Sequence, residues 1–264
     1  MGTIDFGAVT AYLGDLLVGA AQTVWISLLV YVLVIALGTV VALARYNRSR
    51  RIAFGIATVY VELFRNIPAL VVLYLGYFGL PSFGIRIDNY VIGIAVLVIV
   101  IGAYLGESLR GALIGIPRGQ WEAPQSTGFT NGQILRHIIL PQMYQRAWPS
   151  LSNHLMIVLF ATPLLSVIDV RELTSAAAEV NSETFRPVEV YVYAVVIYFV
   201  LGVVLQVGMA QLGKALFRRP GVGSAQLRGS RLGLLMAPRG RRNGAALASE
   251  HRPATPEITE GAAR

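Results

Sequence analysis

Long uncharged stretches dominate the pattern of hydrophobic and polar positions along the chain. A helix needs about 20 mostly apolar residues to cross the hydrocarbon core of a bilayer, and soluble core helices rarely reach that length without a charge. Four stretches meet this requirement, and a fifth, at 52–85, meets it across the internal charges Glu62 and Arg65. The pattern predicts an all-α, polytopic membrane protein with five transmembrane helices, at about 16–44, 54–80, 89–110, 147–168 and 188–213.

The basic residues lie mainly on one side of these predicted helices. The segments that follow the first, third and fifth helices hold 18 of the 22 lysines and arginines. Because cytoplasmic loops are enriched in basic residues, this bias predicts an N-terminus outside and a C-terminus inside. Residues 1–15 are then an extracytoplasmic segment, which lacks the basic start of a cleaved signal peptide. Residues 16–218 form the predicted transmembrane domain.

Composition agrees with this interpretation and excludes several classes of site. The chain is 55% apolar and 14% charged, against roughly 45–50% and about 25% in soluble domains. It contains no cysteine, which excludes disulfides, cysteine-ligated zinc and thiol nucleophiles. The net charge of +8 first suggests nucleic acid or an anionic membrane. Since the charge is one-sided, we assign it to membrane orientation and expect a lipid bilayer, not nucleic acid, as partner.

From residue 219 the chain becomes rich in glycine, arginine, alanine and proline and loses its periodicity. We predict a disordered basic cytoplasmic tail at 219–264, either inert or held near anionic headgroups.

The longest predicted connection, at about 111–146, lies on the cytoplasmic side. A connection of this length usually has a function. Gly128 suits the left-handed position that ends a helix, and Thr130 with Gln133 fits a capping box that starts another. The loop is therefore predicted to be a helix–turn–helix whose second helix ends before Pro141.

Residues of this connection resemble the EAA loop of the membrane subunits of ABC importers. The match consists of Glu122-Ala123-Pro124, three residues, Gly128, nine residues and Ile138-Ile139-Leu140-Pro141. In that family the loop docks on a separate ATPase subunit. The resemblance implies that coupling to the ATPase is carried by Glu122, Ala123, Gly128, Ile138, Leu140 and Pro141. Pro124 stands where the family usually has alanine, so we expect the first loop helix to be kinked or to begin close to Pro124.

Three further segments resemble the polar amino-acid permeases of that family, the histidine, glutamine and glutamate type. They lie at 61–68, at 166–174 and at 185–191, and the similarity covers about 16–218. The resemblance implies a type I importer permease in the bacterial cytoplasmic (inner) membrane. Its implied partners are a second permease subunit, identical or paralogous, two ATPase subunits that bind ATP and Mg, and an extracytoplasmic solute-binding protein. Phe160-Ala161 departs from the family pattern and leaves the exact substrate open.

Charged and helix-breaking residues inside the predicted spans are candidates for the translocation pathway. Ionisable residues in hydrocarbon cost roughly 2.5–3.5 kcal/mol each, so they need partners or water. Glu62 with Arg65 and Glu107 with Arg110 are each three residues apart on one helix face. Either each pair neutralises itself and fixes helix packing, or the four residues line the gate at the subunit interface. The other gate or pathway candidates are Pro68, Asn153, His154 and Thr162.

The chain lacks the signatures of catalysis. Its three histidines are dispersed, so we expect no metal site, and we find no GxSxG or HExxH motif. The stretch from Gly208 to Lys214 lacks the Ser or Thr of a phosphate-binding loop, so we expect no cofactor in this chain. An ion-coupled secondary transporter of small polar solutes is the alternative, which five spans without an internal repeat fit poorly. A membrane enzyme is the third alternative, and the missing catalytic constellation disfavours it.

Overall fold

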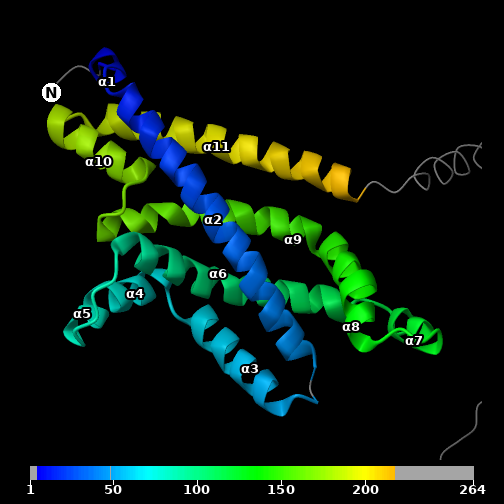
Figure 1. Cartoon of the computed structure of the whole chain (residues 1–264). Helices are drawn as coiled ribbons and strands as arrows, with labels where there is room; N and C mark the ends of the chain where they lie inside the picture. The colour runs from blue at the N-terminus through cyan, green and yellow to red at the C-terminus, as the bar shows by residue number, and fades with distance from the viewer. Residues whose placement is uncertain (1–4, 48, 218–264) are drawn as a thin grey trace, which may run out of the picture. The chain divides into compact units, whose positions relative to one another are not determined.

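The computed structural model describes residues 5–47 and 49–217, and every regular element within these ranges is a helix (Figure 1). The elements are α1 (Gly7–Thr10), α2 (Leu13–Tyr46), α3 (Arg51–Asn66), α4 (Ala69–Tyr74), the π-helix η1 (Leu75–Gly79), α5 (Leu80–Ser82), α6 (Asn89–Ile114), α7 (Gly119–Ser126), α8 (Asn131–Ile134), the π-helix η2 (Leu135–Ile139), α9 (Leu140–Ala161), the 3-10 helix η3 (Thr162–Ile168), α10 (Leu173–Thr184) and α11 (Pro187–Leu216). The predicted tail, 219–264, lies outside the described residues.

Within the described ranges, four helical stretches are long and apolar enough to cross a membrane. They are Leu13–Tyr46, Asn89–Ile114, Asn131–Ile168 and Pro187–Leu216. They correspond to the first, third, fourth and fifth predicted spans, and each extends beyond its predicted bounds. The all-α, polytopic class predicted from the sequence is therefore confirmed.

The second predicted span, 54–80, is not one continuous helix. The chain breaks at Ile67–Pro68, and the axes before and after the break differ by 105°. The cause is local, because a proline disfavours helical backbone at the residue before it. Ile67 is extended, with φ −112° and ψ 132°, and α4 begins directly after Pro68. Pro68 therefore marks a sharp break between two helices.

The chain stays helical from Asn131 to Ile168, which corrects the prediction that the second loop helix ends before Pro141. A π-helical turn, Leu135–Ile139, leads directly into α9. Pro141 falls in the first turn of α9, where a missing N–H costs little. The loop helix and the fourth span are therefore one continuous element.

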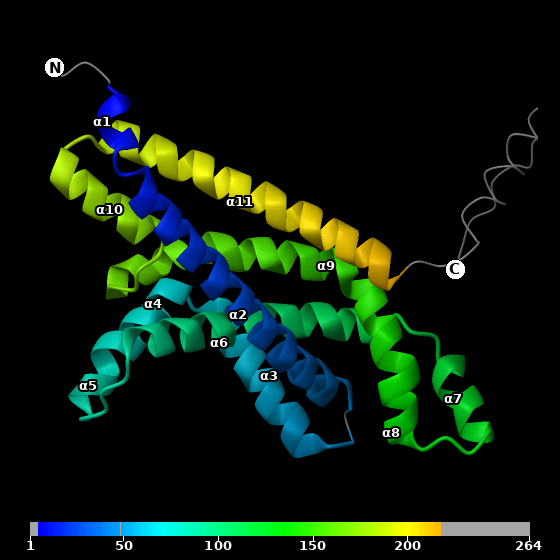
Figure 2. The same cartoon turned by 45° about the horizontal axis from the view of Figure 1, so that its top comes forward.

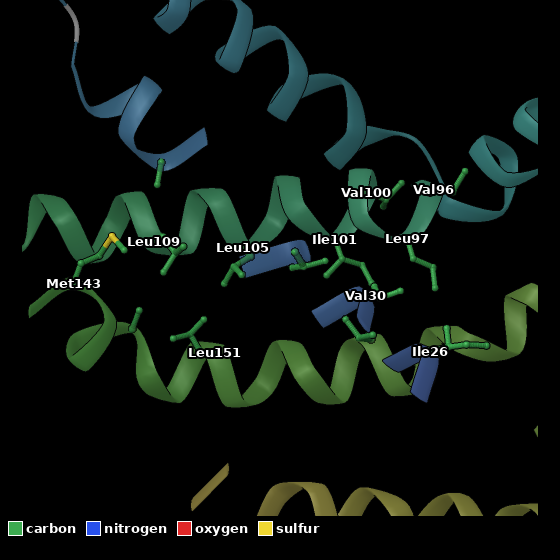
Figure 3. Close-up of a cluster of buried hydrophobic side chains, with 14 of the residues drawn as sticks. Ile26, Val30, Val96, Leu97, Val100, Ile101, Leu105, Leu109, Met143 and Leu151 are labelled. Atoms are coloured by element: carbon green, nitrogen blue, oxygen red, sulfur yellow. The ribbon is translucent and has the colours of Figure 1, made fainter. Parts of the chain in front are cut away.

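The main hydrophobic core lies where α2 crosses α6 and α9 (Figure 3). Leu105 and Leu109 of α6 and Leu151 of α9 are buried in it, together with Val30 of α2. The helices α2 and α6 approach closely because Gly106 has no side chain. A Cβ added there would lie 2.8 Å from Cγ1 of Val41. This close contact makes α2 and α6 the centre of the bundle.

A smaller core lies at the other end of α2, where α10 and α11 pack against it (Figure 2). Leu16, Leu173 and Val190 are fully buried there. The helix α3 is covered much less, since only Ala57 and Val61 among its residues are buried. The two ends of α2 thus hold their neighbours in different ways.

Candidate functional site

The loop between α6 and α9 forms the helix–turn–helix that its sequence predicts. Gly128 has φ +88°, the left-handed conformation expected at this position, and it follows the end of α7. Thr130 caps α8: its backbone N–H donates to Oε1 of Gln133 at 2.8 Å, and its Oγ1 accepts from the backbone N–H of Gln133 at 3.4 Å. The first helix begins at Gly119, so Pro124 lies inside α7 and not near its start.

The predicted coupling residues fall into two sets. Glu122, Ala123 and Gly128 are exposed on α7 and the turn, while Ile138 and Leu140 are half-buried at the base. Pro141 is exposed at the start of α9. The loop therefore exposes Glu122 and Ala123 on α7, while its second helix is partly buried and continues into α9.

Contacts that the sequence analysis missed attach the loop to the bundle. The ring of Trp121 in α7 stacks on Tyr46 at the end of α2, with centroids 5.5 Å apart and planes 12° apart. The Arg146 guanidinium donates to the carbonyl of Gly115 at 2.8 Å. No spacing rule connects residues this far apart, so the aromatic type of Trp121 was the only available signal.

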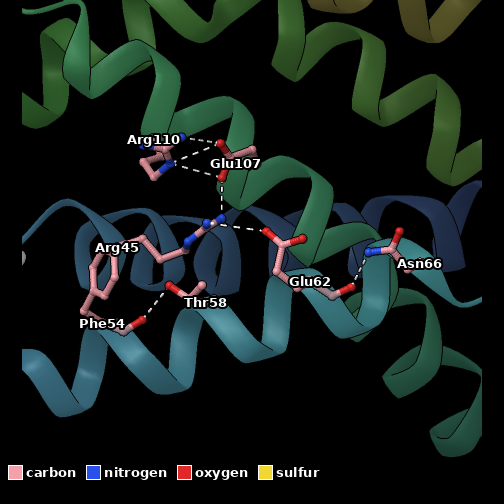
Figure 4. A network of polar contacts seen from close by, with 7 residues as sticks. All are labelled: Arg45, Phe54, Thr58, Glu62, Asn66, Glu107 and Arg110. Atoms are coloured by element: carbon pink, nitrogen blue, oxygen red, sulfur yellow. Dashed lines mark hydrogen bonds and ion pairs between the residues drawn. The ribbon is translucent and has the colours of Figure 1, made fainter.

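A cluster of charged side chains joins α2, α3 and α6 (Figure 4). Arg45 of α2 donates to Glu107 of α6 and lies 3.8 Å from a carboxylate oxygen of Glu62 in α3. Glu107 also accepts from Arg110, one turn further along α6, at 2.5 Å. The side chain of Arg45 is only 11% exposed. Arg45 is therefore the centre of the network, a role that the sequence analysis did not assign to it.

One of the two charge pairs expected from the sequence is formed and the other is not. Glu107 and Arg110 pair, but Glu62 pairs with Arg45 instead of Arg65. The Arg65 guanidinium carbon lies 5.6 Å from the centroid of the Tyr104 ring, and the Tyr104 hydroxyl donates to the Arg65 carbonyl at 2.9 Å. Arg65 thus stays exposed beside an aromatic ring.

The break in the second span carries exposed polar groups. Glu62, Arg65 and Asn66 are all exposed at the end of α3, and Pro68 is exposed where the chain turns. The Asn66 side chain donates to the carbonyl of Glu62 at 2.6 Å and caps the helix end. Because hydrocarbon does not solvate such groups, this face of α3 needs a polar neighbour or water.

The remaining pathway candidates differ in burial, and the structure does not bring them together at one site. His154 is buried, and its Nδ1 lies 2.8 Å from the carbonyl of Ser150 on the same helix, which favours a packing role. Thr162 is fully buried and donates to the carbonyl of Leu159 at 2.8 Å. Asn153 is exposed on α9. Thr162 marks the start of the 3-10 helix that follows α9.

A buried carboxyl group also escaped the sequence analysis. Glu172 is fully buried at the start of α10, where it accepts from the backbone N–H of Ser175 at 2.9 Å and from the Tyr198 hydroxyl at 2.7 Å. Burial raises the pKa of Glu172, and hydrogen bonds from Thr174, Tyr198 and Ser175 oppose this shift. The sequence signal for this helix start was Glu172 followed three residues later by Ser175, which form a capping box with unusual residue types.

Among the described residues, no group of three or more His, Cys, Asp or Glu side chains could hold a metal ion. The candidate functional site consists of the loop that contains α7 and α8, the charge cluster around Arg45 and the exposed break at Pro68.

Comparison with known proteins places this geometry in a family. The family model described as a binding-protein-dependent transport system inner membrane component matches residues 34–218. The probable glutamine ABC transporter permease protein GlnM of Bacillus subtilis is 35% identical over 180 residues, which are 68% of this chain and 83% of that protein. The arginine ABC transporter permease protein ArtQ of Haemophilus influenzae is 34% identical over 162 residues, 59% of this chain and 73% of that protein.

A solved structure agrees with the sequence matches. The crystal structure of an amino acid ABC transporter with histidines superposes with a TM-score of 0.73 and 29% identity. The match covers 81% of this chain and all of the other.

Proposed function

This chain belongs to the family of binding-protein-dependent transport system inner membrane components, and from that premise we propose that it is the permease subunit of an ATP-driven importer for polar amino acids. It is a multi-pass protein of the bacterial inner membrane and a transport subunit, with ATP hydrolysis assigned to a separate subunit. The named relatives carry glutamine and arginine, so the proposed substrate class is the polar amino acids.

The family implies the classes of partner protein, and our proposal adds the number and kind of subunits. Family membership implies association with an ATPase and a solute-binding protein. We assign two ATPase subunits, which bind ATP and Mg, and a second permease subunit, identical or paralogous. The excess of basic residues after the first, third and fifth predicted spans supports an N-terminus outside, a C-terminus inside and a loop on the cytoplasmic side with the ATPase.

The observation that carries the coupling mechanism is the continuous helix from Asn131 to Ile168. Because α8, η2 and α9 form one element, a displacement of the loop moves the fourth span with it. Glu122 provides polar contacts on the exposed face of α7, and Gly128 allows the tight turn between the loop helices. ATP-driven closure of the ATPase subunits shifts a two-state equilibrium of the spans between inward- and outward-facing.

The translocation pathway passes the exposed break of the second span. Glu62, Arg65 and Asn66 are exposed there, and polar groups in a membrane span face a second copy or water, not lipid. Discontinuous helices near the middle of the membrane commonly form substrate sites in transporters. Pro68 creates the break, and Arg45 connects Glu62 of α3 to Glu107 of α6.

Gly128→Val tests the coupling mechanism. Valine is strained at φ +88°, whereas a Cβ added at this position would meet nothing within 4 Å, so we expect the substitution to act on the turn and not on packing. We expect membrane insertion to remain, ATP-dependent uptake of radiolabelled glutamine or arginine to be abolished, and ATP hydrolysis to become independent of the solute-binding protein.

Gly111→Val is the matched control, because Gly111 is exposed, has an ordinary backbone conformation and also meets nothing within 4 Å. Retained uptake in Gly128→Val would contradict the assignment. Wild-type uptake that survives ATP depletion but stops with an uncoupler would instead identify an ion-coupled carrier.

A further inference from the structure

A cavity of about 870 Å³ lies between the end of α2, the start of α3 and the loop helices α7 and α8. Its size falls within the range of about 300–1,000 Å³ typical of small-molecule sites. The stacked rings of Tyr46 and Trp121 form part of its wall. The cavity therefore connects the first two spans to the element proposed to contact the ATPase.

The lining of this cavity is divided between apolar and hydrogen-bond-donating groups. Val40, Leu43 and Ala44 of α2 form an apolar wall, and Val40 is 65% exposed. Asn47 and Arg50 lie in the connection that follows. This arrangement is amphipathic and lies where the apolar part of α2 ends.

The polar groups of the lining are suited to an anion. Arg50 forms no ion pair with any described residue, and none of the lining residues is acidic. The side-chain oxygens of Asn47 and Asn131 accept hydrogen bonds from the Ser49 backbone and the Gln125 side chain, each at 3.1 Å. Their NH₂ groups are further donors among the residues that line the same cavity as Arg50.

We infer that this cavity binds the phosphate headgroup of an anionic phospholipid. Basic pockets between helices on the cytoplasmic side bind such headgroups, and a guanidinium matches the geometry of a phosphate. Arg50 and the amide groups of Asn47 and Asn131 contact the phosphate, while the acyl chains pass along Val40 and Leu43 toward the bilayer. The apolar wall selects a lipid over a free phosphate, which has no apolar part to bury.

The site would also influence coupling, because Trp121 and Asn131 belong to the loop. A bound headgroup links these loop residues to the connection between α2 and α3 and stabilises their present arrangement. This inference rests on the proposed cytoplasmic position of the loop. Lipid binding is measured without transport, so its failure is distinguishable from a failure of the proposed function.

The first test measures lipid retention by native mass spectrometry of the transporter purified with its ATPase subunit. The wild type is expected to retain phosphatidylglycerol, and Arg50→Gln to bind it about tenfold more weakly, equivalent to about 1.4 kcal/mol. Arg51→Gln is the control, since Arg51 is an exposed arginine next to Arg50 that does not line the cavity. Equal retention by Arg50→Gln and the wild type would overturn the inference.

The second test identifies what occupies the cavity. The chain contains no cysteine, so Ala53→Cys places a single thiol on the cavity wall. In phosphatidylcholine nanodiscs, added phosphatidylglycerol should slow its reaction with a maleimide several-fold, and inorganic phosphate should not. Equal protection by inorganic phosphate would overturn the lipid assignment in favour of a free anion. Protection by the ATPase subunit regardless of lipid would overturn it in favour of a protein partner.

Discussion

The two ends of α2 hold their neighbours by different physical means. Near Gly19, α2 contacts α10 through close packing and a buried hydrogen bond, whereas near Arg45 an ion pair with Glu62 supplements a small buried cluster of Val41, Val61 and Ala103. Thr23 accepts from the backbone N–H of Leu173 at 3.0 Å, and both residues are fully buried. Glu62, in contrast, has a side chain that is 61% exposed and lies 3.8 Å from Arg45.

This difference separates a rigid junction from a movable one. Close packing has no alternative arrangement of similar energy, because interiors are dense and a small shift leaves voids or clashes. An exposed ion pair contributes about 0–1 kcal/mol and exchanges readily with other partners. The junction of α2 with α10 is therefore the more tightly packed one, and we propose that α3, bounded by the break at Pro68, is the element that moves during transport.

The largest expected effect tests the packed junction. A Cβ at Gly19 would lie 2.8 Å from Cβ of Ala176 and 3.0 Å from the backbone of Leu173, and backbone cannot move aside easily. Gly19→Val should lower the free energy of unfolding by about 3 kcal/mol, as overpacking does. The measurement is the thermal unfolding midpoint in detergent. Gly14→Val in the same helix is the control, because Gly14 meets nothing within 4 Å.

The next effect concerns the buried carboxyl in this junction. Glu172→Ala removes the cap of α10 and leaves the Tyr198 hydroxyl without its acceptor, which should cost about 2 kcal/mol of stability. A stability equal to the wild type would show that α10 docks by packing alone.

The pH dependence of the same group has a defined sign. The pKa of Glu172 is raised in the folded state, so the folded protein binds the proton more tightly than the unfolded chain does. Its contribution to stability is complete below about 4.3, the ordinary pKa of a glutamate, and is lost as the pH rises through the folded-state pKa. Glu172→Gln cannot titrate, so the stability difference between wild type and variant should change with pH in this direction. A constant difference would contradict the prediction.

The smallest expected change in stability, with a large change in function, concerns Arg65 near the end of α3, the helix that is less buried than α10. Arg65 is exposed and contacts the Tyr104 ring, an interaction that contributes about 0.5–1 kcal/mol at exposed sites. Arg65→Ala should therefore assemble normally, with an unfolding midpoint close to that of the wild type, while ATP-dependent uptake falls at least tenfold, about 1.4 kcal/mol.

Arg51→Ala, at the other end of the same helix, should leave both uptake and midpoint unchanged. Loss of the folded subunit in Arg65→Ala would instead show that the contact of Arg65 with Tyr104 serves the packing of α3 on α6.

Much of the fold and part of the site could be predicted from local sequence patterns. The Gly128 turn and the capping box of Thr130 with Gln133 depend on backbone preferences of a few neighbouring residues, and both are present. The Glu107–Arg110 pair lies within one helix turn and is also present. The pairing of Glu62 was wrong, because its partner Arg45 comes from another helix.

Local sequence patterns were enough to predict a helical chain, four of its long apolar helices and a longest loop that resembles a coupling element, because uncharged length, caps and turn residues act over short distances. Only the tertiary structure decided which charges pair, how sharply Pro68 divides the second span and that Pro141 lets the loop helix continue into α9. The sequence does not distinguish a proline that fits the first turn of a helix, such as Pro141, from one that divides two helices, such as Pro68. Similarly, Arg45 pairs with Glu62 because their helices lie side by side, and only the packing of the helices brings the two residues together.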